Sequence, residues 1–159
     1  MFETRALPRG KMEKLKIPKK PAVSIIKQPE EFKSINLTAG KLLLPGIGKF
    51  PCIDLFIGPD KLFQVTVSAH HPLKYRKLKE MVENIQENPT ASKQELQIYF
   101  VVPQDIYDDF KRQNYINESG NVCKKLDPVV KNIKQYVLKF DLFAANTGQT
   151  PGLGGGAAH

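Results

Sequence analysis

The feature that most constrains the fold is the stretch over residues 50–72, FPCIDLFIGPDKLFQVTVSAHHP, which predicts two short strands joined by a turn. The strands are expected over residues 52–57 and 62–68, where apolar and β-branched side chains predominate. The four residues between them, GPDK, are the residues that a tight hairpin turn prefers. The sequence therefore predicts an antiparallel hairpin, with a helix starting directly after it.

Each of these strands carries one polar residue inside an apolar run. Asp54 lies in the first strand, and Gln64 stands between Phe63 and Val65 in the second. Burying a polar group costs on the order of a few kcal/mol unless the group is paired or binds something. Because the two residues fall in adjacent strands, they predict one small polar site.

A helix is predicted over residues 72–88, with Pro72 in its first turn. Its apolar residues follow helical spacing and form one face; they are Leu78, Met81, Val82 and Ile85. The other face is basic in its first half and acidic in its second, which is opposite to what the helix dipole prefers. A basic helix start beside a polar strand pair suits a phosphate ligand; the alternative is a face of lysines that snorkel into water.

Further elements are expected on both sides of this unit. Residues 41–45 predict a short strand that precedes the hairpin, and residues 96–102 predict a buried strand. A short helix is expected over residues 105–112, and a last helix starts at Asp127. The apolar face predicted for that last helix consists of Val130, Ile133, Val137 and Phe140.

The chain is expected to divide into three parts. Residues 1–40 form a basic segment, either separate from the core or part of it, in which Met12, Leu15 and Ile17 suggest a short strand. Residues 41–143 form the core, and residues 144–159 form a disordered tail rich in glycine. The fold class is therefore α/β, with a small mixed sheet flanked by helices.

Charge favours an anionic partner. The chain carries 24 Lys and Arg residues against 16 Asp and Glu residues, which gives a formal net charge of +8. Such a balance favours contact with nucleic acid, an anionic membrane or an acidic protein, and it also fits a soluble protein with a basic surface. No stretch is long and apolar enough to predict a transmembrane helix, so no membrane partner is expected.

The cysteines indicate an intracellular setting. Cys52 and Cys123 are separate and belong to no Cys-x-x-Cys motif or Cys/His cluster, so neither a disulfide framework nor a zinc site is predicted. The first residues of the chain lack the apolar core of a secretory signal. Reduced thiols fit this pattern best.

The order of strand, strand, strand, helix and strand, with Asp54 in the second strand and Gln64 in the third, resembles the PD-(D/E)xK core of restriction-endonuclease-like nucleases. Three segments narrow the resemblance: FPCIDLFI, LFQVTVSAHHPLK and LQIYFVVPQDIYDDFKRQNY. They resemble the C-terminal region of Crinkler effectors and of the related retrotransposon hot spot proteins. The resemblance covers roughly residues 40–140, and the order and spacing of the motifs carry it.

This resemblance implies a metal-dependent nuclease site. Mg²⁺ would take oxygen ligands from Asp54 and Gln64, with Glu3 as a further acidic ligand from the remnant of the family's first core helix, which is absent or cut short here. Lys74 would supply the ammonium that stabilises developing negative charge, and His71 would contact phosphate or transfer a proton. His70 precedes it, but the His-Pro pair is the part that matches the family.

The sequence also departs from the active pattern. The family places Glu-x-Lys where this chain has Gln-Val-Thr at residues 64–66, so one carboxylate, one amide and no certain lysine remain. Two hypotheses follow: a weak or degenerate metal-dependent nuclease, and a non-catalytic module that binds nucleic acid or a host protein. Binding that ignores Mg²⁺ but weakens steeply with salt would indicate the second.

The resemblance further implies an effector that is secreted, enters a host cell and acts on DNA or a protein in the host nucleus. Neither the NTPase module nor the ubiquitin-like header of the family lies in this sequence, and its oligomeric state is left open. The basic residues expected to contact phosphate are Lys49, Lys61, Lys74, Arg76 and Lys77.

Overall fold

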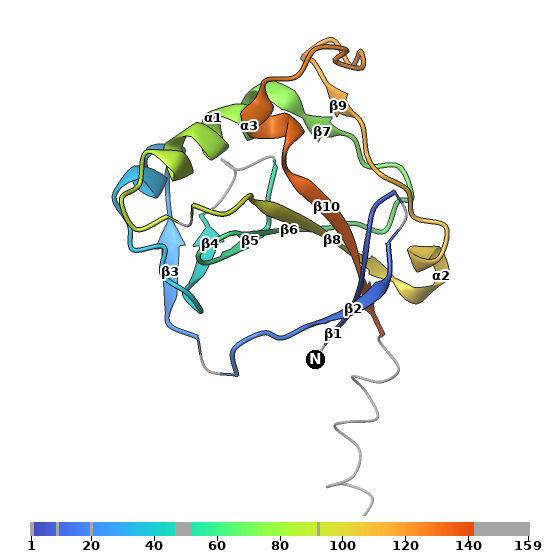
Figure 1. Cartoon of the computed structure of the whole chain (residues 1–159), viewed down its shortest axis with the longest axis horizontal. Helices are drawn as coiled ribbons and strands as arrows, with labels where there is room; N and C mark the ends of the chain where they lie inside the picture. The colour runs from blue at the N-terminus through green and yellow to red at the C-terminus, as the bar shows by residue number, and fades with distance from the viewer. Residues whose placement is uncertain (1, 9, 20, 47–51, 92, 142–159) are drawn as a thin grey trace, which may run out of the picture.

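In the computed structural model, which describes residues 2–8, 10–19, 21–46, 52–91 and 93–141, one mixed sheet of eight strands organises the chain (Figure 1). The strands lie in the order β2-β1-β10-β8-β6-β5-β4-β3. Their bounds are β1 (Phe2–Ala6), β2 (Met12–Leu15), β3 (Val23–Ile26), β4 (Leu42–Pro45), β5 (Leu55–Ile57), β6 (Lys61–Val65), β8 (Gln97–Pro103) and β10 (Lys134–Phe140).

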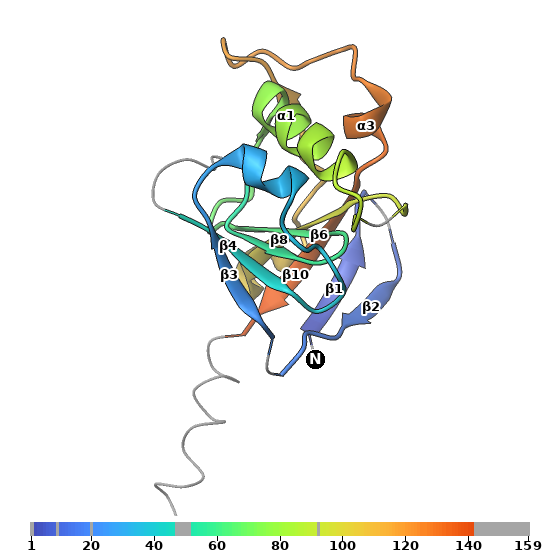
Figure 2. The same cartoon turned by 90° about the vertical axis from the view of Figure 1, so that its left-hand side faces the viewer.

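The helices cover one face of this sheet. In both Figure 1 and Figure 2, α1 (Tyr75–Gln86), α3 (Pro128–Lys131) and the 3₁₀ helix η1 (Pro29–Lys33) lie on the same side. A small parallel pair, β7 (Leu73–Lys74) and β9 (Tyr115–Ile116), lies beside α1, and α2 (Gln104–Tyr107) follows β8. None of the described helices is long and apolar enough to cross a membrane.

The predicted hairpin is confirmed. β5 and β6 are antiparallel, β4 pairs antiparallel with β5, and β6 continues through α1 to the parallel strand β8. The observed strands are shorter than predicted, because β5 begins at Leu55 and β6 ends at Val65. The strands expected over residues 41–45 and 96–102 are β4 and β8, and the helix expected over residues 72–88 is α1.

The prediction of a long last helix is wrong. α3 does begin with Asp127 as its N-cap, whose side chain accepts a hydrogen bond from the Val129 backbone, but it ends at Lys131. β10 follows and pairs parallel with β8 along its whole length. Val137 is buried on the helix-covered face of the sheet and Leu138 on the opposite face. The apolar residues of this segment therefore belong to a central strand that is buried on both faces, and not to one face of a helix.

The described part of residues 1–40 is built into the same sheet. β1 pairs with β10, and β2, which the sequence had suggested as a strand, pairs with β1. Phe32 and Leu37 are buried in the main core under α1. The tail expected over residues 144–159 lies outside the described residues.

The two faces of the sheet carry separate cores. The helix-covered face packs Phe56, Ile98 and Phe100 against α1 and η1. The opposite face is concave, with β3 on one side and β1 and β2 on the other (Figure 1), and it holds a stack of aromatic rings from Phe63, Tyr99 and Tyr136. Neighbouring rings lie 5.2 and 4.9 Å apart between centroids, because these residues are register partners on β6, β8 and β10.

Candidate functional site

The polar pair predicted from the hairpin is brought together. The Gln64 amide Nε2 donates a hydrogen bond to Asp54 Oδ2 over 3.0 Å, and the Val65 backbone N–H donates to the same oxygen over 2.7 Å. Gln64 is 8% exposed, whereas Asp54 is exposed and directly precedes β5. The carboxylate therefore keeps water on its outer side while it fixes the buried amide, so only one of the two groups bears a desolvation cost.

The pair lies where several strands end. β6, β8 and β10 run parallel, so their carboxyl ends meet at one edge of the sheet, and Asp54 reaches that edge at the start of the antiparallel strand β5. Ligands of open α/β sheets bind outside the carboxyl ends of the strands. The candidate functional site therefore lies at this edge, around Asp54 and Gln64.

His71 joins the same edge. Its ring centroid lies 6.5 Å from that of Phe100, and Phe100 is the register partner of Gln64 on β8. The His71 backbone N–H donates to Gln113 Oε1 over 2.6 Å. His70 is exposed, and its backbone N–H donates to the Ser68 side chain. The structure thus places the predicted histidine against Phe100, the strand neighbour of Gln64.

Two buried glutamines that the sequence interpretation missed link the segment that carries His71 to the amino end of β10. The backbone N–H of Gln113 donates to Gln135 Oε1 over 2.8 Å, and Gln135 Nε2 donates back to the Gln113 carbonyl over 3.0 Å. The Gln113 side chain in turn reaches the carbonyls of Ala69 and Lys111. The sequence did contain a sign of Gln135, because it is a polar residue beside the apolar run of β10. The same kind of exception pointed to Gln64 in β6.

The first turn of α1 is basic and adjoins the segment that leads into β5. The thiol of Cys52, which lies two residues before Asp54 in the sequence, contacts the Lys74 carbonyl oxygen at 3.9 Å. Lys74, Arg76 and Lys77 line a hollow of about 310 Å³ between this turn and the segment after β9. Arg76 also forms an exposed ion pair with Glu118 at 3.0 Å.

Burial dominates the chemistry of the Cys52 thiol. It raises the pKa of Cys52 to about 11, although the positive charges of Lys74 and Lys77 act to lower it. We expect iodoacetamide at pH 8 to alkylate the half-buried Cys123 and to spare Cys52, because about one Cys52 thiol in a thousand is ionised there. Mass spectrometry of the labelled chain measures this.

The control for this labelling is the unfolded protein. In denaturant both thiols should be alkylated, and in the native state labelling of Cys52 should rise only as the pH approaches 11. Equal labelling of both cysteines in the native state at pH 8 would show that the first turn of α1 does not cover Cys52.

Two of the predicted site residues lie elsewhere, and the structure does not describe a third. Glu3 is on β1, which β10 and β8 separate from β6 in the sheet, and forms an ion pair with Lys139 at 3.1 Å. Lys61 begins β6, at the end of the strand opposite Gln64, and pairs with Asp60 at 2.8 Å. Lys49 lies outside the described residues.

The described residues at this edge form a weak donor set for a magnesium ion. Among the described residues no group of three or more His, Cys, Asp or Glu side chains could hold a metal. Asp54 supplies a single carboxylate, and one of its oxygens already accepts two hydrogen bonds. The buried Gln64 Oε1, which has no hydrogen-bond partner among the described residues, adds one neutral oxygen. Mg²⁺ keeps several waters and usually takes one or two carboxylates, so this pair, with one carboxylate that is already hydrogen-bonded, is a weak donor set for it.

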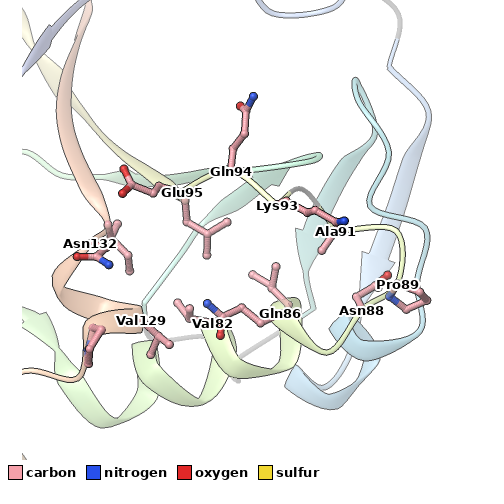
Figure 3. A pocket seen from close by; sticks show the side chains of 14 residues that line it. Val82, Gln86, Asn88, Pro89, Ala91, Lys93, Gln94, Glu95, Val129 and Asn132 are labelled. Carbon is pink, nitrogen blue, oxygen red and sulfur yellow. The ribbon is translucent and has the colours of Figure 1, made fainter.

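A larger pocket of about 620 Å³ opens at the other end of α1 (Figure 3). Val82 and Gln86 extend into it from α1, and Val129 and Asn132 border it from α3 and the residue after it. Asn88, the buried polar residue of its lining, already donates to the carbonyls of Phe32 and Ile35. The pocket therefore presents no unsatisfied buried group, among the residues that the structure describes, that would select a ligand. The edge around Asp54 is the stronger candidate.

Comparisons of this chain with protein-family models, with curated proteins and with solved structures found no match.

Proposed function

We propose that this chain is a Crinkler-like effector domain that binds DNA in the host nucleus through the first turn of α1 and does not cut it. The observation that carries the proposal is the contact between Cys52 and the Lys74 carbonyl, because it sets the basic turn against the segment that leads to Asp54. A secreted origin and a nuclear target remain what the sequence resemblance implies.

The topology supports a restriction-endonuclease-like core. β4, β5 and β6 form an antiparallel unit, and α1 connects β6 to the parallel strand β8. This is the order that the resemblance implies, with Asp54 at the second strand of the unit and Gln64 in the third. β3 lies beside β4, and η1 lies between these two strands in the sequence.

The first turn of α1 suits a phosphate group. It contains no acidic residue, and no side chain caps its N-terminus with a hydrogen bond. The backbone N–H groups at a helix N-terminus carry partial positive charge and bind anions, and Lys74, Arg76 and Lys77 add full charges around the adjacent hollow. Basic residues weaken an isolated helix at this end, so a bound phosphate would relieve their repulsion by the dipole.

The polar pair supports binding without cleavage. Asp54 is engaged by Gln64 and Val65, and the lysine that begins β6 lies at the opposite end of that strand. Phosphodiester cleavage of the restriction-endonuclease type needs a metal that polarises the phosphate and activates water. The one carboxylate at this edge is already hydrogen-bonded and is a weak donor set for such a metal.

Salt-dependent DNA binding tests the proposal. We expect a fluorescent duplex to bind with an affinity that falls steeply with salt and is unchanged by Mg²⁺. Replacing Lys74 and Lys77 together by Glu should weaken binding at least about tenfold and reduce the salt slope by about two. Glu at residue 77 also favours the helix dipole, so the variant should stay folded.

A double variant of Lys14 and Lys93 to Glu is the matched control. Both lysines are exposed; Lys14 lies on the edge strand β2, and Lys93 lines the pocket at the other end of α1. The net charge therefore changes equally, but binding should stay close to that of the wild type. Equal losses in the two double variants would mean that only overall charge matters. Nicking of a plasmid that requires Mg²⁺ or Mn²⁺ and vanishes in Asp54→Ala would instead establish the nuclease hypothesis.

A further inference from the structure

The two edge strands of the large sheet differ in their protection. Exposed edge strands pair with other chains unless charges, bulges or prolines prevent it. β2 carries Glu13 and Lys14 within its four residues. β3, at the other edge, reads VSII and carries no charge (Figure 2).

The backbone groups of two residues of β3 face away from the sheet. The carbonyl oxygens of Ala22 and Ile26 accept hydrogen bonds from Leu42 and Gly46, so both point toward β4. Because successive residues of a strand alternate in direction, the N–H and C=O groups of Val23 and Ile25 point to the outer side. These two residues therefore offer two donors and two acceptors at the edge.

The side chains of the same residues are exposed. Val23 is 55% and Ile25 is 62% exposed, and Leu44, the register partner of Ile25 on β4, is 37% exposed. All three lie on the concave face, because their neighbours Ile26 and Leu43 are buried on the helix-covered face. An apolar patch thus borders a row of outward-facing backbone groups.

We propose that a second copy of this chain pairs with β3 in antiparallel orientation, so that the two large sheets join into one. With Ser24 of one copy opposite Ser24 of the other, Val23 of each copy exchanges two hydrogen bonds with Ile25 of its partner. This register uses all the outward groups of these two residues, and it sets β-branched side chains against one another.

The charges that flank β3 select a second copy as the occupant. Lys16 and Lys19 precede the strand. Lys27 follows it directly, and Glu30 and Glu31 come next in the acidic first turn of η1. In an antiparallel pair the start of one strand meets the end of the other. The two lysines before the strand of each copy therefore face two glutamates and one lysine of its partner, which leaves a net attraction at both ends of the joint.

Sedimentation equilibrium of the full chain tests the pairing. From micromolar to millimolar concentration we expect a monomer–dimer equilibrium, with a Kd in the micromolar range because the joint is small. Ile25→Lys should leave a monomer. Ile25→Pro should do so as well, because it removes an outward N–H that the ladder with β4 does not use. Val122→Lys, at a valine that is 54% exposed on another surface, is the control and should dimerise like the wild type.

Cysteine cross-linking tests the register. Opposite residues of a non-hydrogen-bonded antiparallel pair have Cα atoms about 4.5 Å apart, inside the range of roughly 4.4–6.8 Å that a disulfide spans. With the oxidant diamide, Ser24→Cys should give a covalent dimer beyond the background from the native thiols, and Ile25→Cys should give much less. A wild type that stays monomeric at millimolar concentration overturns the proposal, as does a dimer that both Ile25 variants retain.

Discussion

Gln135→Leu is expected to lower the free energy of unfolding by about 4 kcal/mol. The Gln135 side chain is 2% exposed and exchanges two hydrogen bonds with the backbone of Gln113, and its Nε2 also lies 3.3 Å from the Tyr115 hydroxyl. Leucine fills much of the same volume but leaves the Gln113 N–H and C=O buried without these partners. Urea denaturation followed by circular dichroism measures the change.

Gln104→Leu provides the matched comparison, because Gln104 is exposed at the start of α2. Its effect on the free energy of unfolding should stay within about 0.5 kcal/mol. If Gln135→Leu costs less than about 1 kcal/mol, water reaches Gln113, and the two glutamines do not fix the segment around Gln113 to β10.

The hairpin and its polar pair could be predicted because their signals are local. The turn residues and the alternation over residues 52–68 are visible within one short window of sequence. Asp54 and Gln64 stood out as polar residues inside predicted apolar strands, and they do form a hydrogen bond with each other. The exposure of Asp54 could not be foreseen, since this residue precedes β5 rather than lying within it.

β10 was predicted as a helix because a central strand, buried on both faces, does not show the alternation of apolar and polar residues that marks other strands. Val130, Ile133, Val137 and Phe140 follow a spacing close to that of a helical face. Residues 136–138 are nevertheless all buried, since β8 and β1 flank the strand and both faces of the sheet carry a core. Without alternation in burial, only pairing with β8, far away in the sequence, decides the structure.

Gln113, Gln135 and β1 are placed by contacts between distant parts of the chain. Gln113 lies in an irregular segment, and its partners come from the segment before α1 and from β10. β1 was missed because Glu3 and Arg5 make this short strand resemble a polar segment. Arg5 donates a hydrogen bond to the carbonyl of Tyr107, the last residue of α2. No window of neighbouring residues contains both members of these pairs.

Gly58→Ala is expected to cost about 3 kcal/mol of stability, because no space exists for a side chain in the turn of the hairpin. A Cβ at residue 58 would lie 2.5 Å from the carbonyl oxygen of Leu37 and in still closer contact with that of Thr38. These are backbone atoms, so a rotamer change cannot relieve the clash. Gly58 is also fixed on both sides, since its N–H donates to Lys41 and its carbonyl accepts from Gly40.

Gly120→Ala separates this steric effect from the loss of glycine itself. Gly120 has a φ of +83°, but a Cβ added there would meet no described atom within 4 Å, so alanine encounters backbone strain alone and should cost about 1 kcal/mol. In thermal unfolding, the midpoint temperature of Gly58→Ala should therefore be well below that of Gly120→Ala. Equal losses would mean that residues 37 and 38 yield to the added methyl group. The hairpin that carries Asp54 and Gln64 would then not be fixed by the segment before β4.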